Sequence, residues 1–167
     1  MDARIDAGRG YDHGTFVPMM LIRPDADVPV LQMSLVAGLD PATHIAIGRA
    51  LAPLLAHGVS VIGSGLSFHN LRALLRGEPM PGTADADFDG WLNDTVLDPD
   101  MDDDARAARL TDWRSAPGAA FCHPREEHLL PLHVCFGAAA VAVWGAHTIS
   151  RYDLMGFATS GFGWSAA

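Results

Sequence analysis

The first half of the chain combines two patterns of apolar positions. Residues Val28 to Val36 are mostly apolar and include several branched side chains, which predicts a buried strand. A helix is predicted next, with Asp40 as its N-cap, Pro41 in its first turn and Gly58 after its end. Val59 to Ile62 then predicts a second short strand. A strand, a helix and a strand in this order form a βαβ unit, so we predict an α/β fold.

Further elements are predicted along the rest of the chain. Helices are expected over residues 71–76, 88–97, 102–113 and 126–140, and a closing strand over residues 148–159. The predicted sheet is central, mixed or mostly parallel, and flanked by helices. No internal repeat or linker marks a boundary, so residues 1–167 are expected to form a single domain.

Composition narrows the classes of partner. The chain has a net charge of -9 and its basic residues are all arginines, so it lacks the concentrated positive charge that nucleic acids require. Its two cysteines have neither metal-binding spacing nor the density of a disulfide scaffold, which favours a reducing compartment. We find no apolar run long enough for a membrane span and no secretion signal in the sequence, so the expected location is the cytoplasm.

Eight histidines are the first candidates for chemistry. His44 and His57 fall within the predicted capped helix and are expected to be structural. His13 lies in a Gly-Tyr-Asp-His-Gly segment that favours a tight turn with an exposed imidazole, although an Asp-His pair can also be only a local hydrogen bond. His69 ends the segment GSGLSFH after a predicted strand, where α/β proteins bind ligands. An imidazole there suits proton transfer, and the glycines allow a ligand to approach the backbone.

The densest cluster of such residues runs from Cys122 to His133, with the sequence CHPREEHLLPLH. It places imidazoles and carboxylates within a few residues of one another. Non-haem metals in oxygen chemistry are typically held by two histidines and one carboxylate. The cluster can supply one or two of these ligands. The alternative is a charged first turn of a helix, in which Glu126 and Glu127 are favoured by the helix dipole.

Three blocks of the sequence, taken together, resemble a known family. They begin at residues 11, 39 and 123 and contain YDHGTFVP, GSGLSFHN and HPREEHLLPLHV. In content, order and spacing they are similar to LigB-like class III extradiol dioxygenases, in the subgroup that contains 4,5-DOPA dioxygenases. The resemblance implies an enzyme that uses a mononuclear divalent metal, Fe(II) or Zn²⁺, and dioxygen to open a catechol-type ring next to its hydroxyl pair.

The resemblance also implies roles for particular residues. His69 matches the family's catalytic histidine, a general base and later acid. His13 matches a second active-site histidine that meets substrate or bound oxygen. His128 is the preferred metal ligand, with Glu127 and His123 as alternates that the sequence does not rank. A structural zinc site formed with Cys122 is a further alternative.

One departure from the family pattern affects these expectations. Family members carry a preceding segment with His-Gly-Ser-Pro and Ala-His-Trp motifs, whose histidines bind the metal, and neither motif occurs here. The chain is therefore expected to be N-terminally truncated, with a sheet that is incomplete on its N-terminal side and a weakened metal site. The expected partners are a catechol-type substrate and dioxygen, with a second copy or another chain supplying the missing part. The alternative is a catalytically inactive fragment that serves as a binding or oligomerising module.

Overall fold

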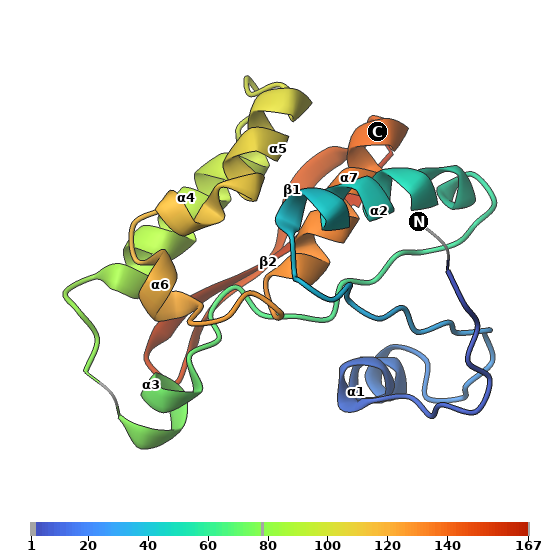
Figure 1. Ribbon diagram of the computed structural model, residues 1–167, viewed down its shortest axis with the longest axis horizontal. Helices are drawn as coiled ribbons and strands as arrows, with labels where there is room; N and C mark the ends of the chain where they lie inside the picture. Colours follow the sequence, from blue (N-terminus) through green and yellow to red (C-terminus); the bar gives the residue numbers. More distant parts are fainter. Residues whose placement is uncertain (1–2, 78, 167) are drawn as a thin grey trace. The chain divides into compact units, whose positions relative to one another are not determined.

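The computed structural model describes residues 3–77 and 79–166, and contacts divide the chain into two compact units, Met1–Ser34 and Leu35–Ala167 (Figure 1). The expected single domain over residues 1–167 stays a prediction. In the described part of the chain, no helix is long and apolar enough to cross a membrane.

In its described residues, the first unit contains one helix, α1 (His13–Ile22). The side chain of Gln32 ties its start to the extended segment that follows, because the Gln32 Oε1 accepts from the Asp12 amide at 3.0 Å and from the Thr15 hydroxyl at 2.8 Å. The Tyr11 hydroxyl donates to the carbonyl of Val30 at 2.6 Å. The predicted tight turn around His13 is thus the beginning of a helix, and the imidazole is exposed.

The second unit is built around the crossing of two apolar helices, α2 (Pro41–Leu55) and α7 (Leu130–Ala142). As predicted, Asp40 caps α2, with its carboxylate accepting from the Thr43 amide at 2.8 Å. The two helices approach each other through glycines. A Cβ atom at Gly48 would collide with the Val134 carbonyl, and one at Gly137 with the Ile45 carbonyl.

Further helices surround the rest of the core: α3 (Leu71–Arg76), α4 (Ala84–Leu97), α5 (Asp103–Thr111), η1 (Trp113–Ser115) and α6 (Ala119–Cys122). The helix predicted over residues 71–76 is confirmed as α3, whereas α4 begins before the predicted range 88–97 and α5 ends before the end of the predicted range 102–113. Buried Arg106 joins α4 to α5, since its guanidinium donates to the carbonyls of Asp98 and Met101, each at 2.8 Å. The core contains large side chains from several helices and from the segments between them, including Phe68, Phe88, Leu92, Leu110, Trp113, Leu129 and Phe136.

The sheet differs from the prediction. It is an antiparallel hairpin of β1 (Gly145–Leu154) and β2 (Phe157–Ser165), where one strand over residues 148–159 was expected. The chain reverses at Met155 and Gly156, which both have positive φ angles, 55° and 94°. Two residues with positive φ fit a tight hairpin whose twist matches that of its strands. Leu154 then pairs directly with Phe157.

The two strands predicted over residues 28–36 and 59–62 do not form, so the predicted parallel sheet and its βαβ unit were wrong for the described residues. Both segments lack regular secondary structure, and among the described residues neither pairs with a strand. Branched apolar residues favour extended backbone, whereas a strand also needs a partner for its hydrogen bonds. Instead, the chain after Ile62 runs along the first turn of α7, where the Leu66 amide donates to the His128 carbonyl at 3.0 Å.

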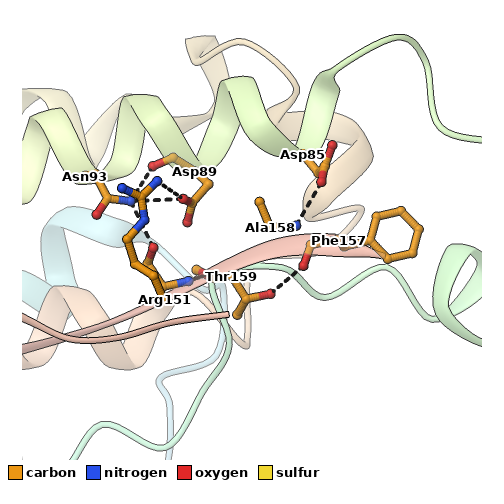
Figure 2. A network of polar contacts seen from close by, with 9 residues as sticks. Asp85, Asp89, Asn93, Arg151, Phe157, Ala158 and Thr159 are labelled. Atoms are coloured by element: carbon orange, nitrogen blue, oxygen red, sulfur yellow. Dashed lines mark hydrogen bonds and ion pairs between the residues drawn. The ribbon is translucent and has the colours of Figure 1, made fainter. Parts of the chain in front are cut away.

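The hairpin packs against α4 through a buried polar network (Figure 2). The Asp89 carboxylate on α4 accepts from the Asn93 amide at 3.2 Å and pairs with the Arg151 guanidinium of β1 at 3.1 Å. The Asp85 carboxylate accepts from the Ala158 amide of β2 at 2.8 Å. Buried polar groups require such partners, so this network fixes how the hairpin lies on α4.

Candidate functional site

His69 occupies the last position before the cap of α3. Its amide donates to the carbonyl of Cys122 at 2.9 Å. The next residue, Asn70, caps α3 with its side-chain oxygen and donates from its amide group to the carbonyl of Phe121 at 2.8 Å. These bonds hold the backbone on both sides of His69 against the end of α6.

The glycines before His69 allow the backbone to approach α7. A Cβ atom at Gly63 would lie 2.8 Å from the Pro131 carbonyl oxygen, and one at Gly65 would collide with the His128 carbonyl. Sequence reasoning assigned these glycines to the approach of a ligand. In the structure they permit contact with the chain's own backbone, so their packing role is the one that the geometry supports.

The segment His123–His128 connects α6 to α7. The predicted helix over residues 126–140 begins later, at Leu130, so Glu126 and Glu127 lie before the helix rather than in its first turn. Glu126 pairs with the Arg114 guanidinium at 2.7 Å and its carbonyl accepts from the amide of Leu129 at 2.9 Å. The segment is therefore an ordered connection that can hold side chains in defined positions.

His69 and His128 lie face to face. Their ring centroids are 3.4 Å apart and their planes are inclined by 14°. The Glu127 carboxylate lies beside them, with 3.9 Å between its Oε1 and the Nδ1 of His128. Glu127 also pairs with Arg125, whose Nε is 3.3 Å from its Oε2. The predicted convergence of His69 with the HPREEH cluster is thus confirmed in geometry, while the role of each residue stays a prediction.

The electrostatics of His69 favour a neutral imidazole. Partial burial lowers the pKa of His69, because water is not available to solvate the charged ring, and the negative charge of Glu127 opposes this shift. A neutral imidazole can accept a proton, and the adjacent carboxylate can then stabilise the cation that forms.

His123 does not join this group. It is fully buried, and its Nε2 lies 2.9 Å from the carbonyl oxygen of Ser67. Its ring meets Phe88 and Trp113 in edge-on contacts with centroids 5.4 and 5.8 Å apart. Burial lowers the pKa of His123 to about 4, so the ring is neutral at physiological pH.

The remaining histidines have other surroundings. His13 belongs to the first unit, and its predicted role in the site stays a prediction. His44 is structural as expected, since its buried ring lies 2.7 Å from the Asp40 carbonyl and accepts from the Val36 amide at 3.2 Å. His57 follows α2 and is exposed, as is His147 on β1. His133 is buried in α7, with its Nε2 2.8 Å from the Leu110 carbonyl.

A cavity of about 450 Å³ opens beside His69. The residues that line it include His69, Glu127, Phe121 and two arginines, Arg72 and Arg125. In residues 3–77 and 79–166, no ion pair to Arg72 occurs. The cavity can therefore offer a flat apolar wall, a proton acceptor and positive charge to one small molecule.

The donors for a metal ion are fewer than a complete site requires. Among the residues that the structure describes, no group of three or more His, Cys, Asp or Glu side chains could hold a metal. The zinc-site alternative with Cys122 is therefore not formed there. Cys122 is a free, buried thiol that points to the Ala84 carbonyl. Glu127 and His128, one carboxylate and one imidazole, are the adjacent pair whose chemistry suits a divalent ion.

The contact between the His123 ring and the Ser67 carbonyl was not predicted from the sequence. No local signal marks it, because the two residues lie far apart in the chain. Asn70 could have been found, since an asparagine directly before an apolar helical segment is a common N-cap.

Comparison with known proteins gives one matching family over nearly the whole chain. Residues 1–163 match the family described as the catalytic LigB subunit of aromatic ring-opening dioxygenase. The chain is similar to the dioxygenase tasH of Hapsidospora irregularis, with 42% identity over 151 residues, which covers 83% of this chain and 45% of that protein. It is 39% identical to the 4,5-DOPA dioxygenase extradiol of Portulaca grandiflora over 142 residues, which covers 81% of this chain and 49% of the relative.

The fold is similar to that of a solved structure. An uncharacterized protein from Escherichia coli K12 superimposes with a TM-score of 0.74 and 27% identity, covering 92% of this chain and 62% of that one. The chain spans about half the length of the two curated relatives described above.

Proposed function

Because the chain belongs to the LigB family of aromatic ring-opening dioxygenases, we propose that it opens the ring of a catechol-type substrate next to its hydroxyl pair, with dioxygen as co-substrate. The observation that carries this proposal is the stacked pair of His69 and His128, with Glu127 beside it and His69 in the wall of a cavity. Opening a catechol ring needs a proton acceptor and a metal ion at the adjacent hydroxyls. His69 can accept the proton, and His128 and Glu127 can bind the metal.

His128 and Glu127 are proposed as the metal ligands of this chain. Imidazole and carboxylate are ligands that both Fe(II) and Zn²⁺ accept, so the donor pair fits either ion. Either ion, when bound, would make a catechol hydroxyl more acidic, and Fe(II) would in addition supply a path for electrons to dioxygen, which Zn²⁺ does not. The sequence left His123 as an alternate ligand, and its burial and its bond to the Ser67 carbonyl support a different role.

His69 is proposed as the catalytic base. Its lowered pKa keeps the ring neutral, so its free nitrogen can accept the proton of a catechol hydroxyl. Glu127 then stabilises the resulting imidazolium. The His69 imidazole can return the proton as the catechol ring opens. His13 is proposed as a second active-site histidine on the basis of the family resemblance.

The cavity supports a proposal about the substrate class. Arg72 and Arg125 both line its wall, while the chain as a whole is acidic. Guanidinium groups bind carboxylates through paired hydrogen bonds, so we expect a catechol that carries an anionic group. The relative from Portulaca grandiflora is named a 4,5-DOPA dioxygenase extradiol, and DOPA is a catechol that carries a carboxylate.

The metal site is proposed to be completed by polypeptide outside this chain. Two adjacent donors are fewer than the three protein ligands typical of such metals, and the curated relatives described above are about twice as long as the matched part. The further ligands would come from polypeptide outside residues 1–167. By itself the chain should then bind the metal weakly.

Oxygen uptake tests this proposal. The chain is assayed with Fe(II) and a panel of catechols, alone and mixed with the unmatched part of the Portulaca grandiflora relative. We expect catechol-dependent oxygen consumption and a yellow ring-opened product, stronger in the mixture. If neither oxygen consumption nor the yellow product is seen, with the chain alone and in the mixture and with Fe(II) bound, the proposal is contradicted. A catalytically inactive binding module would then be favoured.

A further inference from the structure

The buried imidazole of His123 has a geometry that the proposed chemistry does not use. Its Nε2 lies 2.9 Å from the Ser67 carbonyl oxygen, and its Nδ1 is buried without a hydrogen-bond partner. A carbonyl oxygen only accepts, so Nε2 must carry the hydrogen. In the neutral ring Nδ1 is then the unprotonated nitrogen. The geometry thus selects one tautomer.

The aromatic residues around His123 do not by themselves explain why a histidine occupies this position. Phe88 and Trp113 meet the ring in edge-on contacts, which a phenyl ring could also make. A phenylalanine at this position would avoid leaving a buried nitrogen without a partner, which costs free energy. The property that imidazole adds is the N–H directed at Ser67.

Ser67 lies at the centre of the segment that carries His69, and it is held from two sides. Its carbonyl accepts from His123, and its hydroxyl oxygen accepts from the Ser160 amide of β2 at 2.8 Å. Ser67 and Ser160 are both buried, so these bonds are shielded from competition with water. His69 is two residues further along the chain, and its ring stacks on the ring of His128.

We propose that His123 is a positioning residue, whose Nε2–H holds the Ser67 carbonyl and thereby keeps the His69 ring in register with His128. The importance of this placement for catalysis rests on the proposed function. The placement itself can be measured in the chain without metal or substrate, so its failure is distinguishable from failure of the ring-opening activity.

The unmodified protein provides the first test. Long-range ¹H–¹⁵N correlation spectra of the histidine-labelled chain at pH 7 distinguish the two neutral tautomers of each imidazole. We expect His123 as the Nε2–H tautomer, with assignment from the spectrum of His123→Gln. The Nδ1–H tautomer at His123 would overturn the proposal.

Matched variants provide the second test. His123→Phe removes the donor and keeps a ring of similar shape, whereas His123→Gln keeps a donor. His133→Phe is the control, because His133 is equally buried and its Nε2 also faces a backbone carbonyl, that of Leu110. The readouts are thermal unfolding and the nuclear Overhauser effect between the ring protons of His69 and His128.

We expect both phenylalanine variants to lower the unfolding temperature, and only His123→Phe to lose most of the His69–His128 effect. His123→Gln should retain it. Should His123→Phe not fold, the Gln variant and the native tautomer decide. An undiminished effect in folded His123→Phe, equal losses in His133→Phe, or loss in folded His123→Gln would each show that His123 does not position His69.

Discussion

The imidazole of His69 stacks on that of His128 although the two residues belong to different segments, one before α3 and the other before α7. Neighbouring backbone bonds support the pair, since the His69 amide bonds to the Cys122 carbonyl and the Leu66 amide to the His128 carbonyl. The ring proposed to transfer protons and the proposed metal ligand are thereby held by main-chain contacts. Such an arrangement reduces the reorganisation that catalysis would require.

The guanidinium of Arg72 is expected to select anionic substrates. Replacing it with methionine should raise KM for a carboxylated catechol by about tenfold, equal to about 1.4 kcal/mol, because one charge-assisted hydrogen bond is lost. The KM for an uncharged catechol should stay nearly constant. Steady-state oxygen uptake on both substrates measures this ratio. Arg76→Met is the control, since Arg76 lies on the same helix but not in the cavity wall; equal effects of both variants would rule out a specific role for Arg72.

Stability should fall as the pH is lowered from 7 to 5. Burial depresses the pKa of His123 to about 4 from 6.5, and it also lowers the pKa of His133. Between the two values the unfolded chain binds more protons than the folded one, so the free energy of unfolding decreases as pH falls. His123 alone should contribute a loss of about 2 kcal/mol over this interval.

Urea unfolding at pH 7 and pH 5 measures this loss. The variant His123→Gln does not titrate, so its stability should depend less steeply on pH. A wild-type stability that is constant over this interval, or a Gln variant with the same slope, would contradict the buried neutral state of His123.

The crossing of α2 and α7 should not tolerate a methyl group at Gly48. A Cβ atom there meets the Val134 backbone, so Gly48→Ala forces the helices apart and should cost about 1–3 kcal/mol or more. Gly90, within α4, has open space around the same position. Gly90→Ala should therefore stabilise the protein by about 0.5–1 kcal/mol, since alanine favours helices. Equal effects of the two substitutions in urea unfolding would show that the crossing is not closely packed.

The sequence was informative wherever local chemistry decides the structure. The Asp40 cap and Pro41 predicted the start of α2, because the signal lies within a few residues. A strand was predicted at residues 59–62 and does not form, and the local sequence could not show this because a strand depends on a partner elsewhere in the chain. The reversal at Met155–Gly156 was missed because methionine is rarely found with a positive φ.

The candidate site shows the same division. Sequence blocks predicted that His69 and the HPREEH cluster converge, and their rings do meet. Within the cluster, however, the sequence could not separate His123 from His128. Only the packing of Phe88 and Trp113 around His123, and the distant Ser67 carbonyl, distinguish this buried ring from the His128 ring that stacks on His69.

The most direct test of the proposed site is the effect of His69→Ala on catechol-dependent oxygen uptake in the Fe(II)-loaded protein, measured with the complementing polypeptide present. His57→Ala is the control, because His57 is an exposed residue after α2. We expect His69→Ala to lower the rate by about 10²- to 10⁴-fold, as for the loss of a general base, with the fold intact by circular dichroism. The control should keep the wild-type rate. A His69→Ala protein that turns over catechol at the wild-type rate would contradict the assignment of His69 to the reaction.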